Sequence, residues 1–180
     1  MTKRRSRAVA VGVLLGAGMA LAAPEAQYLT LRTPQNAYTV QVTDRALTSA
    51  DIQLSHVGTE VRGRMFDQVV FLDVAADRVT GTVGNRITRL NFREKDEGVT
   101  EVQGNFLGRL THLSLGPRAF TGYVGNCGYD LKVTPEGAYE GSRSCGGLPQ
   151  RPVVLTLPPA LTQQGPAMTL LTLAMVLGNG

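Results

Sequence analysis

The segment at residues 102–115, Val-Gln-Gly-Asn-Phe-Leu-Gly-Arg-Leu-Thr-His-Leu-Ser-Leu, contains the pattern that decides the fold. It begins with an apolar-x-Gly triplet, has a second glycine near its middle, and ends in five residues that alternate between polar and apolar. Alternation with a period of two predicts a β-strand that has one apolar face and one wet face. Glycine near the middle favours a tight turn. The segment therefore predicts a β-hairpin.

The same pattern occurs five times along the chain, with 18 to 23 residues between the glycines of successive triplets. The triplets are Val61-Arg62-Gly63, Val79-Thr80-Gly81, Val102-Gln103-Gly104, Phe120-Thr121-Gly122 and Tyr139-Glu140-Gly141. Five hairpins in series predict about ten short strands. A glycine inside a strand indicates a bend or a close approach of two backbones. We expect a mainly β fold, an antiparallel meander of about five glycine-containing hairpin repeats at about 61–157 that forms a curled sheet, a roll or a barrel.

The two ends of this meander are less regular. Residues 23–37 are interpreted as an extended lead-in, and residues 38–180 as a single β-domain. Residues 38–42 alternate and predict a further strand, while residues 44–60 are ambiguous.

The C-terminal segment predicts a short apolar helix at about 166–177. Pro166 is typical of a first helical position, and Gly-Asn-Gly at 178–180 is typical of a stop. The segment is too short to span a bilayer and has no charge, so we expect it to be buried as a lid or plug on the apolar face of the sheet. One more buried strand is the alternative.

Residues 1–22 have the three parts of a cleavable signal peptide. Four positive charges lie in the first seven residues, an apolar stretch follows over 8–21, and Ala20-Leu21-Ala22 matches a signal peptidase site. An uncleaved anchor is the alternative, but the apolar stretch is shorter than the roughly 20 residues that span a bilayer. We expect export to the periplasm, the cell envelope or the medium.

The net positive charge of the chain comes from this signal. Of 18 basic residues, four lie within 1–22, where there is no acid, so the mature chain has 14 basic and 14 acidic residues. A formally neutral domain has no long-range positive field, and we therefore expect no nucleic-acid partner.

Cys127 and Cys145 are the two cysteines of the chain. An even number in an exported protein favours a disulfide, which on the chain-entropy model would stabilise this domain by about 3 kcal/mol. Two buried free thiols are the alternative. A metal site is disfavoured because neither histidine is near in sequence.

The sequence predicts no catalytic, cofactor-binding or metal-binding residues. His56 and His112 lack spaced ligand partners, and no serine stands in a nucleophile elbow. Tyr123, Tyr129 and Tyr139 lie near the predicted disulfide and form a tentative binding surface. Packing beneath the disulfide is the alternative role for these tyrosines.

We therefore expect an exported, non-enzymatic β-domain with a binding or structural role in the envelope. The sequence identifies neither its specific activity nor its partner, for which a protein and an envelope component are the candidates. One alternative is a secreted hydrolase that uses carboxylates such as Asp67, Asp73 and Asp77. Another alternative is an outer-membrane β-barrel, which also starts from a signal and consists of hairpins. The predicted strands are shorter than the 9–11 residues typical of that class.

Overall fold

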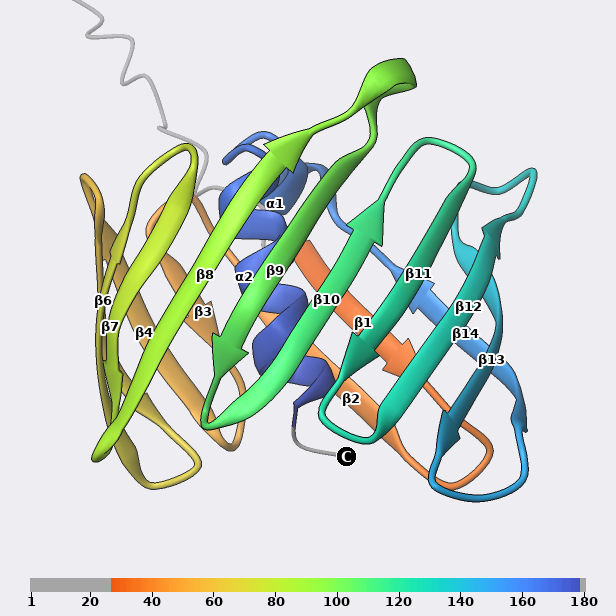
Figure 1. Cartoon of the computed structure of the whole chain (residues 1–180), viewed down its shortest axis with the longest axis horizontal. Helices are drawn as coiled ribbons and strands as arrows, with labels where there is room; N and C mark the ends of the chain where they lie inside the picture. The colour runs from red at the N-terminus through yellow and green to blue at the C-terminus, as the bar shows by residue number, and fades with distance from the viewer. Residues whose placement is uncertain (1–26, 179–180) are drawn as a thin grey trace, which may run out of the picture.

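The computed structural model describes residues 27–178. The predicted signal peptide at 1–22 and its cleavage site lie outside the described residues. Figure 1 shows one sheet that curls around a helix.

The sheet is a closed barrel of fourteen antiparallel strands, and each strand pairs with its neighbours in the chain. Pairing of the first strand with the last closes the ring, so every strand among residues 27–178 has a neighbour on both sides. The strands are β1 (Gln27–Arg32), β2 (Ala37–Val42), β3 (Ala46–Thr48), β4 (Ile52–Val57), β5 (Glu60–Met65), β6 (Gln68–Val74), β7 (Arg78–Val83), β8 (Arg86–Glu94), β9 (Thr100–Phe106), β10 (Arg109–Leu115), β11 (Ala119–Val124), β12 (Cys127–Val133), β13 (Tyr139–Cys145) and β14 (Gln150–Thr156). The predicted antiparallel meander is confirmed, and it is a closed barrel.

Each sequence repeat is one hairpin of this barrel, from β5–β6 to β13–β14. Four further strands precede the repeats. Strand β1 lies within residues 23–37, for which the sequence predicts an extended lead-in outside the domain. Leu29 and Leu31 point into the core, and Thr30 lies opposite Thr156 of β14. Part of the expected lead-in thus belongs to the domain, because a meander closes only when its first strand pairs with its last.

The glycine of each triplet allows one strand to pass close to the strand before it. At Gly104 the backbone has a φ of 152°, and a Cβ would collide with the carbonyl oxygen of Arg89 on β8. The other four triplet glycines face the equivalent carbonyl of the preceding strand; they are Gly63, Gly81, Gly122 and Gly141. The repeat is therefore a steric requirement of the barrel wall.

The core of the barrel is filled by helix α2 (Pro166–Leu177), which follows the short helix α1 (Pro159–Thr162). All eleven residues from Ala167 to Leu177 are buried. The inward faces of the strands supply the apolar side chains around it. The predicted C-terminal helix is confirmed, and it lies inside the barrel as a plug. Among residues 27–178, no helix has the length and apolar character needed to cross a membrane.

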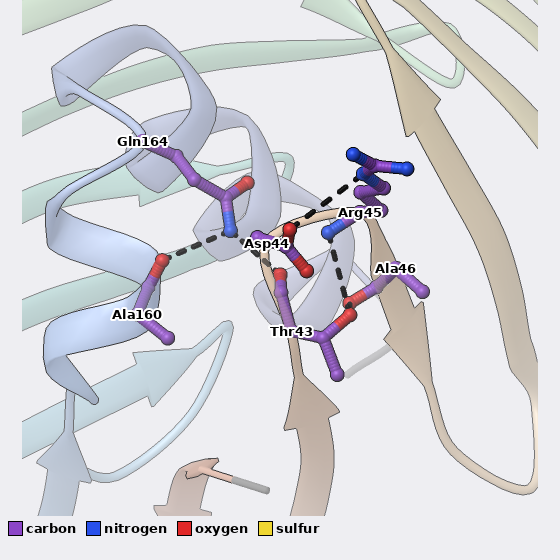
Figure 2. A network of polar contacts seen from close by, with 6 residues as sticks. All are labelled: Thr43, Asp44, Arg45, Ala46, Ala160 and Gln164. Atoms are coloured by element: carbon purple, nitrogen blue, oxygen red, sulfur yellow. Dashed lines mark hydrogen bonds and ion pairs between the residues drawn. The ribbon is translucent and has the colours of Figure 1, made fainter. Parts of the chain in front are cut away.

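Hydrogen bonds hold the helical segment at both ends. Gln164 Nε2 donates to the carbonyl oxygens of Thr43, at 2.8 Å, and Ala160, at 2.9 Å, which ties the link between the helices to the β2–β3 turn (Figure 2). At the other end, Arg109 Nη1 donates to the carbonyl oxygen of Gly178. These bonds attach both ends of the helical segment to the barrel wall, and the bond from Arg109 satisfies a carbonyl at the C-terminus of α2.

The predicted disulfide is confirmed. Cys127 begins β12 and Cys145 ends β13, and the two residues face each other in the register of these strands, with a Cα separation of 4.0 Å. The bond links neighbouring strands at one end of the barrel. A disulfide is typical of an oxidising compartment outside the cytoplasm.

Candidate binding groove

A groove of about 980 Å³ lies on the outer wall of the barrel, over strands β8 to β11. These strands run across the front of Figure 1. Because side chains alternate along a strand, every second residue of each strand points outward into this groove while its neighbours fill the core. The outward residues of these strands thus line the groove, and the inward residues of the same strands line the core.

The strand register assembles one polar row across the groove floor. Asn91 lies opposite Gln103, Gln103 opposite His112, and His112 opposite Tyr123. Neighbouring strands are about 4.8 Å apart, so this row spans roughly 14 Å. It presents two amide side chains, an imidazole and a phenol to a ligand, all of which donate and accept hydrogen bonds.

A second row lies closer to the turns. Asn105 is flanked by Arg89 on β8 and by Leu110 on β10. The Asn105 Oδ1 atom is buried and has no hydrogen-bond partner among the described residues. A buried acceptor without a partner costs about 1–3 kcal/mol. Because this oxygen has almost no accessible surface, a ligand can donate to it only when the Asn105 amide group turns toward the groove.

One end of the groove carries an aromatic pair. The rings of His112 and Tyr123 meet edge to face, with centroids 5.9 Å apart and planes at 74°. Tyr123 keeps 42% of its surface exposed, so its ring remains accessible. Ile87 and Leu110 also line the groove and are 69% and 70% exposed. Exposed apolar and aromatic groups beside amides suit a ligand that has both apolar and polar faces.

The charges of the groove are all positive. Arg86 and Arg89 line it, and its lining residues in the described part of the chain include no aspartate or glutamate. Arg86 Nη1 donates to the carbonyl oxygen of Leu107 at 2.7 Å, which holds the guanidinium at the rim. Within residues 27–178, neither arginine forms an ion pair with an acid.

The structure separates the three tyrosines of the predicted binding surface. Tyr123 lies outside in the groove, whereas Tyr129 points into the core and is buried. Tyr123 faces Gly128, the neighbour of Tyr129, so the two tyrosines are on opposite faces of the wall. The Tyr139 hydroxyl donates to the carbonyl oxygen of Gly116 at 3.0 Å. The three residues do not share one surface.

Tyr129 belongs to a polar cluster inside the barrel. Burial raises the pKa of its phenol, and the charge of Arg143 opposes this rise. Arg143 is buried, and its Nε donates to Gln150 Oε1 at 2.7 Å. The Tyr129 hydroxyl donates to the carbonyl oxygen of Leu177 at 3.4 Å. These contacts give the cluster a structural role at the end of helix α2.

The carboxylates considered for hydrolysis do not meet at the groove. Asp67 lies in the β5–β6 turn and Asp77 in the β6–β7 turn, which are at opposite ends of the barrel. Asp73 is exposed on β6. In the part of the chain that the structure describes, no three His, Cys, Asp or Glu residues are grouped so that they could hold a metal ion.

The sequence shows no spaced ligand partner for His112, and it does not reveal the groove around this residue. The sequence contains one signal of the groove: amide side chains occupy outward positions 91, 103 and 105 of neighbouring hairpins. Only the register of β8 to β10 shows that these positions are adjacent.

Comparison with known proteins returned no match. No family model, curated protein or solved structure is significantly similar to this chain.

Proposed function

We propose that this protein is an exported, non-enzymatic binding protein whose outer groove holds a polysaccharide chain. The observation that carries the proposal is the row of Asn91, Gln103, His112 and Tyr123 across the groove floor. Beside this row, a sugar hydroxyl can donate to the Asn105 amide oxygen once that amide group turns toward the groove, which removes the cost of leaving the oxygen unpaired.

The remaining lining has the chemistry that a sugar chain requires. Asn91, Gln103 and Asn105 combine an acceptor and two donors in each side chain, which matches the mixed hydrogen-bonding capacity of hydroxyl groups. The exposed ring of Tyr123 offers an apolar face to the C–H side of a sugar. A roughly 14 Å row of polar groups suits an elongated ligand.

The surroundings of the groove support an aqueous location outside the cytoplasm. The disulfide between Cys127 and Cys145 favours an oxidising compartment. Outward-facing charged residues such as Arg89 and Asp73 are exposed on the wall. A wall in contact with lipid tails would instead need an apolar outer band. These features support an envelope or secreted binding role.

Asn105→Leu tests the proposal because binding and stability should change in opposite directions. Removing an unpaired buried acceptor should leave the free energy of unfolding unchanged or increase it. Loss of one hydrogen bond to the ligand should weaken binding by roughly threefold to tenfold. Gln53→Leu, at an exposed outward position on β4, is the matched control and should change neither property.

Binding is measured by isothermal titration with dextran, polygalacturonate and fully methyl-esterified polygalacturonate. We expect the wild-type protein to bind at least one of these polymers, and Asn105→Leu to bind it more weakly than Gln53→Leu does. No binding across the three polymers, or equal binding by the two variants, would contradict a polysaccharide site in this groove.

A further inference from the structure

We propose that the polysaccharide is acidic and that its carboxylates bind Arg86 and Arg89 along the β8 side of the groove. This inference rests on the proposed function and names the class of polymer that the groove selects. It starts from an imbalance of charge. The groove is lined by two arginines and by no acid of the described chain, although residues 23–180 contain 14 basic and 14 acidic residues.

Arg86 is held in place before any ligand arrives. One of its terminal nitrogens donates at 2.7 Å to the carbonyl oxygen of Leu107, which lies in the turn that joins β9 to β10. A guanidinium has five N–H donors, so this bond leaves donors for an incoming anion. Since its position is already restrained, less side-chain entropy is lost when it binds.

Arg89 supplies the second charge from the groove floor. It lies opposite Asn105 in the register of β8 and β9. Arginine matches the planar geometry of a carboxylate and can bind it through two parallel hydrogen bonds. A sugar unit that carries both hydroxyl and carboxylate groups can therefore bind Asn105 and Arg89 together.

The two sides of the groove have different chemistry. The arginines come from β8, and the His112–Tyr123 pair comes from β10 and β11. This arrangement directs the acidic groups of the polymer toward β8 and its apolar sugar faces toward β11. Single-stranded nucleic acid is also anionic, but its recognition uses aromatic rings that stack on successive bases. The groove offers one such pair beside three amides, which favours sugar.

Two polymers with the same sugar backbone, one charged and one neutral, test the inference. Polygalacturonate carries a carboxylate on each sugar unit, and its fully methyl-esterified form has the same backbone without that charge. We expect the wild-type protein to bind the acidic form more tightly and to lose this preference as salt is raised, because exposed ion pairs are screened.

Arg86→Gln and Arg89→Gln should each weaken binding of polygalacturonate by roughly threefold to tenfold and weaken binding of the neutral form less, so that the preference for the acidic polymer falls. Arg32→Gln is the matched control, since Arg32 is exposed at the end of β1, on the other side of the ring of strands. It should behave like the wild type.

Each failure has a separate meaning. Equal affinity for the acidic and neutral polymers would overturn the charge inference and leave the proposed polysaccharide site standing. No binding of either polymer, or of dextran, would overturn both proposals. Oligo(dT) that binds as tightly as polygalacturonate would also overturn the inference, because the groove would then recognise negative charge without recognising sugar.

Discussion

Helix α2 fills the barrel, and a charge placed at Leu171 tests how far the fold depends on it. Leu171 is completely buried near the middle of the helix. Truncating such a side chain to alanine typically costs 2–5 kcal/mol, and aspartate adds the cost of burying a carboxylate that has no partner. We therefore expect Leu171→Asp to unfold the barrel or make it aggregate.

The whole helix contributes more than a single side chain. Seven large apolar side chains of α2 are buried; they are Met168, Leu170, Leu171, Leu173, Met175, Val176 and Leu177. At about 1.5–3 kcal/mol each, their burial contributes on the order of 10–20 kcal/mol. A typical domain has a net stability of about 5–15 kcal/mol. Deletion of residues 166–180 should therefore leave no folded barrel.

The assay combines thermal unfolding followed by circular dichroism with size-exclusion chromatography. Leu148→Asp is the matched control, because Leu148 is 90% exposed and its replacement should change stability by less than about 0.5 kcal/mol. A deletion variant that stays monomeric and melts at the wild-type temperature would refute the claim that the fold depends on helix α2. The barrel wall would then be stable without the helix.

Three further predictions address the wall, the disulfide and the interior. Gly104→Ala should destabilise the protein by roughly 3 kcal/mol or more in urea unfolding, because the backbone conformation of Gly104 and the adjacent carbonyl exclude a Cβ. Gly147 has open space around it, so Gly147→Ala is the control and should have little effect. Joint replacement of Cys127 and Cys145 by serine should lower the free energy of unfolding by about 3 kcal/mol, and mass analysis of the native protein should find no alkylatable thiol. Because burial raises the pKa of the Tyr129 phenol, the stability it contributes is present below its ordinary pKa of about 10 and is lost as the pH rises above that value. Tyr129→Phe should therefore reduce the alkaline loss of stability in a pH series.

The strand pattern could be predicted where a hairpin contains its own turn. In the five repeats, the triplet glycine, the turn and the alternating segment are close in sequence, so each hairpin is visible locally. Closure of the barrel is different. Strand β1 pairs with β14, and Thr30 meets Thr156 across almost the whole chain. No local pattern indicates that β14 is the partner of β1, so the sequence alone predicts a lead-in for residues 23–37.

The buried helix could be predicted because residues 167–177 contain no charge, so any folded state must cover them. The groove could not be predicted from one sequence. Asn91, Gln103, His112 and Tyr123 come from four strands and meet only through the register of three strand pairs. A one-residue shift in any pair would move the following side chains to the opposite face of the wall.

Chemical-shift mapping by NMR tests the central claim most directly. On titration of the protein with polygalacturonate, we expect the largest changes at the side-chain amide of Asn105 and at backbone amides of β8 to β11 near His112 and Tyr123. Residues of β1 on the far side of the ring should not change. Shift changes concentrated away from these strands, or none at a concentration that saturates binding, would contradict the groove as the binding site.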